Sequence, residues 1–357
     1  MPILALTLSL AASSPVSLDP NGFAVTLQQQ TGSPGAAVVI DCGAGAAEGV
    51  AGLRIQGGTA AIAPGDLWHM GSNTKAMTAT LAARLVEAGV ISWASSVTDI
   101  LGDLIGEIDP ALGAVTLSEL LAHQGGVRAN AGMVTTLRLV GADADRDVAA
   151  DRRTYAAHSL SNAGGARGDF LYSNAGYVIA ALMLETAAGR PYEAMMQDEV
   201  FAPLGMDSAG WGPPGTPGGA GQPRGHRAAM FSGLSAREPG AGADNPPALN
   251  SAGRAHMSLE DLADFLRAHA DRPDDYLDAE SWDRLQTPVG DADYALGWGV
   301  RETGVLSHAG SNTLWFVQMA VDPRSGCVAA AGVNDGRIDR VREPVGQALE
   351  RLLSSAN

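Results

Sequence analysis

The sequence predicts a mixed α/β fold of the α+β kind, with one antiparallel sheet built from both ends of the chain, flanked by helices, and an all-helical domain inserted. Two observations support this fold. Strand-like segments occupy residues 35–65 and return after residue 290, and the residues between them show mainly helical periodicity. We therefore expect a sheet domain from residues 21–66 and 290–357, and a mainly helical domain from residues 67–289 that contains a loop rich in Gly and Pro at 209–247.

Residues 1–20 resemble a signal peptide or a disordered N-terminus. They hold an apolar run followed by small residues, but no basic residues precede that run. The pattern favours a periplasmic or secreted protein, with a cytoplasmic protein as the alternative. No segment reaches the ~20 apolar residues that span a bilayer.

The first regular elements are two strands, Ala36–Ile40 and Val50–Ile55. A helix follows Ser72 and runs to about Gly89, because apolar residues recur there at helical spacing. Ser72 is therefore expected at a strand-to-helix junction, where free N–H groups favour negative charge.

Three further helices are predicted from their periodicity and end signals: Thr116–Ala122, Asn174–Ala188 and Ser258–His269. The last part of the chain predicts four strands and a closing helix: Tyr294–Val300, Gly304–His308, Thr313–Val321, Cys327–Val333 and helix Arg340–Leu353.

The two cysteines, Cys42 and Cys327, lie far apart in the sequence, in segments that both predict strands. An exported protein could join them in a bridge between adjacent strands. We favour the alternative, in which they are two small buried residues. Two cysteines without clustered histidines predict no zinc site, and we expect neither a metal nor another cofactor.

The composition is that of a globular protein, with 46% hydrophobic and 17% charged residues. The net charge of −16 argues against nucleic acid and anionic membranes as partners. With these partners disfavoured, we expect a small-molecule substrate. The oligomeric state stays open.

Lys75 is the only lysine of the chain, and the other 22 basic residues are arginines. Arginine replaces lysine where only a charge is needed, but not where the amine must lose its proton. Ser72 lies three residues earlier, on the same face of a helix. The pair therefore predicts a serine nucleophile with Lys75 as its proton acceptor.

Two further segments supply partners for this pair. In Tyr172-Ser173-Asn174, a phenol near the lysine ammonium would be pushed toward phenolate, so that Tyr172 could act as base on Ser72 and as acid on the leaving group. Asn174 would orient the lysine or bind a substrate amide. In His308-Ala309-Gly310-Ser311, Gly310 would let substrate approach the backbone, and the N–H groups of Ser72 and Ser311 would hold an oxyanion. His308 would bind a substrate carboxylate or stabilise Tyr172.

These three elements together resemble the class C β-lactamase family of serine hydrolases, which also includes DD-peptidases, D-amino-acid peptidases and family VIII carboxylesterases. The signature Ser-x-x-Lys, Tyr-x-Asn and Lys/His/Trp-x-Gly is met in order, and the likeness runs from about residue 33 to 350. The resemblance implies a β-lactamase/DD-peptidase-like fold with its site between the two domains. It also implies nucleophile Ser72, Lys75 and Tyr172 sharing the proton transfers, Asn174 assisting, and an oxyanion hole from Ser72 and Ser311.

One departure concerns the substrate. β-Lactamases of this family carry a lysine that contacts the antibiotic's carboxylate at the position of His308, and the chain has no second lysine. A neutral imidazole binds an anion more weakly than an ammonium does. This places efficient β-lactam hydrolysis in doubt.

Other residues have weaker signals. His69 is interpreted as a packed neighbour and His123 as a residue that holds a loop. Trp298 and Trp315 would wall an acyl pocket or pack in the core. Gly225-His226-Arg227 is a candidate substrate contact within the long loop.

The sequence favours a serine hydrolase that cleaves a small ester or amide through an acyl-serine, carboxylesterase-like, with weak β-lactam hydrolysis as a side activity. The alternative enzymes are a D-Ala-D-Ala carboxypeptidase, a D-aminopeptidase or a β-lactamase. A peptidase would need a cationic patch at the site, for which Arg128, Arg227 and Arg254 are the candidates. The alternative without turnover is a penicillin-binding sensor module.

Overall fold

A computed structural model describes residues 19–140, 146–219, 221–229 and 233–355 of the chain. The signal-like segment predicted for residues 1–20 lies almost wholly outside the described residues. Within these ranges, no helix is both long and apolar enough to cross a membrane.

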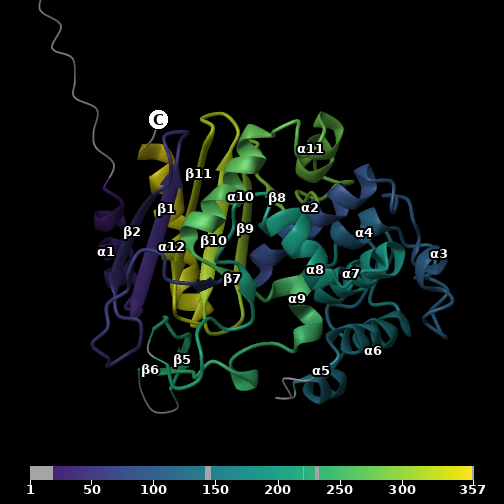
Figure 1. Cartoon of the computed structure of the whole chain (residues 1–357), viewed down its shortest axis with the longest axis horizontal. Helices are drawn as coiled ribbons and strands as arrows, with labels where there is room; N and C mark the ends of the chain where they lie inside the picture. Colours follow the sequence, from purple (N-terminus) through teal and green to yellow (C-terminus); the bar gives the residue numbers. More distant parts are fainter. Residues whose placement is uncertain (1–18, 141–145, 220, 230–232, 356–357) are drawn as a thin grey trace, which may run out of the picture.

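The centre of the fold is a six-stranded antiparallel sheet to which both ends of the chain contribute (Figure 1). Its strand order is β2-β1-β11-β10-β9-β8. The strands are β1 Gly35–Asp41, β2 Ala47–Gly52, β8 Gly299–Val300, β9 Leu306–Ser311, β10 Phe316–Asp322 and β11 Cys327–Val333. The first strand pairs with the last, with Ala36 opposite Val333. The predicted fold class is confirmed.

Strand β1 is buried along its whole length because helices cover both faces of the sheet. Val38 and Ile40 face a cluster that includes α1 (Pro20–Thr31) and α12 (Ile338–Ser355), whereas Val39 points into the main core. This alternation follows from the period of two along a strand. Helix α1 was not predicted; it starts at the cap Asp19 with Pro20 in its first turn and ends at Gly32 in the left-handed conformation.

Most other helices lie together on the side of the sheet away from α1 (Figure 1). They are α2 Thr74–Glu87, α3 Val97–Leu101, α4 Leu117–Leu121, α5 Met133–Leu139, α6 Val148–Leu160, α7 Asn174–Ala188, α8 Tyr192–Met196, α9 Asn250–Gly253, α10 Leu259–Asp271 and α11 Ala279–Gln286. Helix α7 has its predicted bounds, because Ser173 caps its start and Gly189 ends it in the left-handed conformation.

Besides the unpredicted α1, two further parts of the chain differ from the prediction. Of the strand expected at Tyr294–Val300, only Gly299–Val300 forms, because Gly297 at φ 81° turns the chain and brings Tyr294 into a bridge with Gly299. The mainly helical region also contains small sheets: β3 Trp68–His69, β7 Ala255–Met257 and β4 Gly210–Trp211 form one, and β5 His226–Ala228 with β6 Leu234–Ala236 form another. The division into two domains at residues 66 and 290 stays a prediction.

A disulfide joins Cys42 to Cys327, so our preference for two unbridged buried cysteines was wrong. The reason is the strand pairing. Asp41 at the end of β1 lies opposite Val328 in β11, which places the following and preceding residues, Cys42 and Cys327, side by side with Cα atoms 4.1 Å apart. Periodicity alone does not reveal which strands are neighbours.

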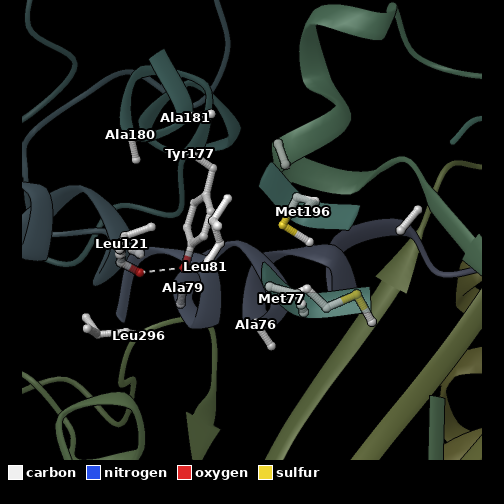
Figure 2. Packing of buried hydrophobic residues seen from close by; sticks show 14 of the residues in the cluster. Ala76, Met77, Ala79, Leu81, Leu121, Tyr177, Ala180, Ala181, Met196 and Leu296 are labelled. Atoms are coloured by element: carbon white, nitrogen blue, oxygen red, sulfur yellow. Dashed lines mark hydrogen bonds between the residues drawn. The ribbon is translucent and has the colours of Figure 1, made fainter. Parts of the chain in front are cut away.

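The packing of α2 against α7 fixes the positions of two predicted site residues, Lys75 and Asn174. Met77 and Leu81 of α2 are buried in the same cluster as Tyr177 of α7 (Figure 2). The Tyr177 hydroxyl donates a hydrogen bond of 2.6 Å to the carbonyl of Leu121 (Figure 2). Since a buried polar group must find a partner, this bond also ties α7 to α4.

Candidate active site

Ser72 lies in a short 3-10 helix, Gly71–Asn73, that leads directly into α2. Gly71 has φ 51°, in the left-handed region that glycine adopts most easily. The Thr74 hydroxyl closes the turn with a 2.7 Å hydrogen bond to the Gly71 carbonyl. The turn therefore presents Ser72 at a helix start, as the sequence predicted.

The Lys75 amine is fully buried and has three oxygen partners. Its Nζ lies 3.1 Å from Ser72 Oγ, 2.8 Å from Asn174 Oδ1 and 2.5 Å from the carbonyl of Ala252. Burial lowers the pKa of Lys75 well below its ordinary value. The amide and carbonyl oxygens only accept, so a neutral amine donates to both and keeps its lone pair for the Ser72 hydroxyl.

Tyr172 lies just before α7, in a segment held by His123. The N–H of Ser173 donates to His123 Nδ1 at 3.1 Å, and the N–H of Leu171 donates to the His123 carbonyl at 2.8 Å. The Tyr172 ring centre is 4.3 Å from that of His123 and 4.9 Å from Lys75 Nζ. The backbone on both sides of Tyr172 is thus fixed by one residue.

The ionisation of Tyr172 differs from our expectation. Burial raises the pKa of Tyr172 to about 12, although a hydrogen bond with Ser72 acts in the other direction. We expected a lysine ammonium to push the phenol toward phenolate, and this was wrong. A buried Lys75 with a lowered pKa supplies no positive charge, so the phenol keeps its proton.

Asn174 contacts both the lysine and a residue that the sequence analysis missed. Its Oδ1 accepts from Lys75, and its Nδ2 donates to Asn130 Oδ1 at 3.1 Å. Asn130 also lies within 3.4 Å of the Tyr155 hydroxyl. The only sequence signal for Asn130 is its place four residues after Gly125-Gly126.

Strand β9 ends directly against the turn that carries Ser72. A Cβ atom on Gly310 would lie 1.9 Å from the Met70 carbonyl oxygen and 2.8 Å from the Ser72 nitrogen, and one on Gly71 would lie 2.3 Å from the Ser311 nitrogen. Real Cβ atoms do not make such contacts, so glycine is required at both positions. The approach brings the backbone of Ser311 next to that of the 70–72 turn, as an oxyanion hole requires.

His308 is buried, and its Nε2 lies 3.1 Å from the hydroxyl of Tyr294. Its Nδ1 has no hydrogen-bond partner among the described residues. Burial lowers the pKa of His308 to about 3, because it disfavours the charged imidazolium. The imidazole is therefore neutral. Its ring centre lies 6.5 Å from that of Tyr172.

The remaining sequence candidates have partners in the core or in neighbouring loops. Trp315 packs edge-on against Trp68, and Trp298 stacks on Phe265, so both tryptophans belong to the core. His226 is buried and bonds to the carbonyl of Asn334 and the N–H of Gln56. These residues stabilise the fold, and the substrate contact expected at 225–227 stays a prediction.

The three arginines proposed as a cationic patch have other partners or positions. Arg254 pairs with Asp244 at 3.1 Å, and Arg128 donates to the carbonyl of Asn162. Arg227 is exposed on β5, paired with Ser235. The described residues contain no group of three or more His, Cys, Asp or Glu side chains that could hold a metal ion.

Comparison with known proteins assigns the chain to a protein family. A family model described as Beta-lactamase matches residues 22–349. The chain is similar to unguisins hydrolase ungD' from Aspergillus campestris (strain IBT 28561), with 24% identity over 294 residues, 76% of this chain and 53% of that protein. It is also similar to penicillin-binding protein 4 from Amycolatopsis lactamdurans, 28% identical over 180 residues, 48% of this chain and 43% of that protein. The chain thus spans about half the length of these curated relatives.

Solved structures with the same fold cover nearly the whole chain. A D-amino acid amidase from Ochrobactrum anthropi SV3 matches with a TM-score of 0.74 and 21% identity, over 94% of this chain and 98% of its own. An octameric penicillin-binding protein homologue from Pyrococcus abyssi matches with a TM-score of 0.75 and 22% identity, over 92% of this chain and 76% of its own. At these identities the likeness shows the fold.

Proposed function

The chain belongs to the Beta-lactamase family, and from this premise we propose that it is a serine hydrolase that cleaves a small ester or amide through an acyl intermediate on Ser72. The observation that carries the proposal is the partner set of Lys75. A fully buried amine with a lowered pKa lies 3.1 Å from the Ser72 hydroxyl, while two carbonyl-type oxygens take its N–H groups. Such an amine can act as a general base that accepts the proton of the Ser72 hydroxyl.

In the first step, the Ser72 hydroxyl gives its proton to Lys75 Nζ as its oxygen attacks the carbonyl carbon of the substrate. The carbonyl π bond opens, and the negative charge on its oxygen is held by the N–H groups of Ser72 and Ser311. Asn174 and the Ala252 carbonyl stabilise the ammonium that forms on Lys75, because both accept from it.

In the second step, the bond to the leaving group breaks, and that group takes a proton from Tyr172. The raised pKa of Tyr172, about 12, keeps the phenol protonated at neutral pH and suits it to be this acid. The phenolate then recovers a proton from the Lys75 ammonium. Water attacks the acyl-serine by the reverse sequence of proton transfers, which releases the acid and restores Ser72.

The charges around the site favour a substrate without a carboxylate next to the scissile bond. His308 is neutral, and Arg254 is already paired with Asp244. An apolar side chain is exposed close to the site: Phe170, whose ring contacts those of His123 and Tyr294, has 47% exposure. An ester or amide with an uncharged apolar group therefore fits better than a D-Ala-D-Ala peptide or a β-lactam, and β-lactam hydrolysis would be weak.

A second candidate is the cleavage of D-amino-acid amides. It is favoured by the pair of side-chain amides, Asn130 and Asn174, beside Lys75, because amides recognise amides through paired hydrogen bonds. The D-amino acid amidase from Ochrobactrum anthropi SV3 has the same fold. This candidate keeps the same nucleophile and differs in the leaving group.

Time-resolved intact-protein mass spectrometry tests the proposal. We expect a transient adduct on Ser72 with p-nitrophenyl butyrate, steady release of p-nitrophenol, and little loss of nitrocefin. The Ser72→Ala variant should form no adduct and lose turnover. Ester hydrolysis that survives Ser72→Ala would refute the nucleophile. A long-lived nitrocefin adduct with little ester turnover would instead favour the peptidase or penicillin-binding alternatives, and faster turnover of D-phenylalanine amide than of the ester would favour the amidase.

A further inference from the structure

We propose that Asp244 is a positioning residue that holds together the two backbone segments of the oxyanion hole, acting through His69 on one and through Asn312 on the other. The inference rests on the function proposed above and adds residues that act without touching the substrate. Asp244 comes from the Gly- and Pro-rich loop at 209–247.

Asp244 is buried, and both of its carboxylate oxygens are occupied. Oδ2 lies 2.8 Å from His69 Nε2 and 3.1 Å from Arg254 Nε, while Oδ1 accepts from Asn312 Nδ2 at 3.2 Å. Its side chain is 1% exposed. A buried carboxylate is costly unless it is paired and hydrogen-bonded, so the geometry around it is tightly specified.

The first link runs from Asp244 to the nucleophile turn. His69 is fully buried, and its Nδ1 accepts a 3.1 Å hydrogen bond from the N–H of Gly71. Since Nδ1 accepts, the ring proton sits on Nε2 and points at Asp244. The carboxylate therefore selects the tautomer that holds the Gly71 peptide, and the next peptide carries the N–H of Ser72.

The second link runs from Asp244 to the end of β9. Asn312 follows Ser311 and is 6% exposed, and it donates both to Asp244 and to the carbonyl of Ala243 at 3.2 Å. Its own Oδ1 accepts from the N–H of Leu314. The chain reverses here through Thr313, at φ 69°, a conformation unfavourable for a β-branched residue. Asn312 therefore fixes where β9 ends and how the Ser311 N–H is aimed.

Arg254 offsets the negative charge of the Asp244 carboxylate, which would otherwise repel a nearby oxyanion. An uncompensated negative charge would oppose the charge that develops on the substrate oxygen. The Arg254 guanidinium neutralises Asp244 and is itself held by Asn250 Oδ1 at 2.7 Å. Burial alone would raise the pKa of Asp244, but His69, Arg254 and hydrogen bonds outweigh it and hold the pKa below its usual value. Arg254 also lies two residues after Ala252, whose carbonyl binds Lys75.

The test compares kinetic and stability effects of Asp244→Asn with those of a matched control. In Asp244→Asn we expect kcat for p-nitrophenyl butyrate to fall about 10- to 100-fold, with KM within about threefold of the wild-type value. This loss of kcat is smaller than the roughly 10²–10³-fold loss that follows removal of an oxyanion donor itself. Labelling of Ser72 by a fluorophosphonate, whose adduct places an oxygen in the same hole, should slow by a similar factor. The double variant His69→Ala/Asp244→Asn should lose less than the product of the two single effects, because the link through His69 is shared and only the link through Asn312 is lost in addition.

The control is Asp66→Asn, which breaks another buried pair, between Asp66 and Arg54 at 2.6 Å. It should lower the melting temperature and leave kcat unchanged. If Asp244→Asn fails to fold, Asn312→Ala tests the second link by the same criterion. A folded Asp244→Asn or Asn312→Ala with wild-type kcat and labelling rate overturns the inference. The proposed function fails separately, if Ser72→Ala retains turnover in the same assay.

Discussion

The Nζ atom of Lys75 lies 2.8 Å from Oδ1 of Asn174, a residue 99 positions further along the chain. Lys75 belongs to the first turn of α2 and Asn174 begins α7. Because the two helices pack on each other, the contact does not depend on a mobile loop. An amide oxygen in this place takes one N–H of the amine, and the Ala252 carbonyl takes another. The lone pair that remains on Nζ faces the Ser72 hydroxyl, so the proton is transferred from Ser72 Oγ to Lys75 Nζ.

The first prediction concerns the need for a deprotonated amine. Lys75→Arg keeps the charge but prevents deprotonation, so kcat for p-nitrophenyl butyrate should fall by about 10²–10⁴, the usual contribution of a general base. The control is Arg190→Lys, which exchanges one cationic side chain for another at a partly exposed position outside the site. It should leave kcat unchanged. Near-wild-type rates in Lys75→Arg would mean that Lys75 serves only as a positive charge.

The second prediction concerns pH. Catalysis needs Lys75 neutral and Tyr172 protonated. The rate should therefore rise with pH through the lowered pKa of Lys75, and fall only as pH approaches the raised pKa of Tyr172, about 12. Between these two pKa values, kcat/KM should be flat. An acid limb close to the ordinary lysine value of 10.5 would show that the amine is protonated at neutral pH and cannot be the base.

The third prediction concerns substrate charge. His308→Lys places an ammonium where the neutral imidazole lies, and an ammonium binds a carboxylate more strongly. We expect the ratio of nitrocefin to p-nitrophenyl butyrate hydrolysis to rise by about tenfold, which corresponds to about 1.4 kcal/mol. His308→Gln, which stays neutral, is the comparison and should not change the ratio. A parallel change of both rates in His308→Lys would place the carboxylate of nitrocefin elsewhere.

The sequence predicted the motif residues more completely than their surroundings, for physical reasons. Ser72 and Lys75 are three residues apart on one helical turn, so local periodicity places them together. The third element was found through Gly310, because a glycine before a strand end signals close approach of backbone. Tyr294 was missed because it was assigned to a strand, and only the turn at Gly297 directs it to His308.

Long-range partners carry no local signal. The Ala252 carbonyl precedes β7, which pairs with β3, and strands of three and two residues are too short for periodicity to detect. The Asp244 carboxylate reaches His69 from the preceding loop, 175 residues further along the chain. The ionisation of Tyr172 was predicted with the wrong sign because burial is a property of the packed fold. The disulfide depends in the same way on β1 and β11 being neighbours, at opposite ends of the chain.

The fourth prediction concerns this disulfide. Cys42→Ser/Cys327→Ser should lower the free energy of unfolding by about 2–4 kcal/mol, because a closed loop of 285 residues limits the unfolded chain. The measurement is urea unfolding with and without a reducing agent, which should shift the wild type but not the variant. Turnover should be unchanged. Cys327 is the first residue of β11 and pairs with Asp322, the last residue of β10. Ser311 pairs with Phe316, at the opposite end of β10. A loss of kcat in the folded variant would contradict this separation.

The fifth prediction concerns the contact of β9 with the nucleophile turn. In Gly310→Ala, the new methyl group would meet the Met70 carbonyl oxygen at 1.9 Å and the Ser72 nitrogen at 2.8 Å, so strand and turn must move apart. Both donors of the proposed oxyanion hole belong to these two segments. We expect kcat to fall by at least about 10²-fold, comparable to the loss of an oxyanion donor.

The control for this substitution is Gly106→Ala, where a Cβ meets no atom within 4 Å and the backbone is not left-handed. It should leave both kcat and melting temperature unchanged. Circular dichroism and thermal melting separate a local displacement from unfolding of Gly310→Ala. Because the methyl group adds only bulk, a folded Gly310→Ala protein with unchanged kcat would mean that the hole is formed by backbone other than Ser72 and Ser311. Reduced kcat with unchanged fluorophosphonate labelling would mean that β9 acts on deacylation rather than on formation of the tetrahedral anion.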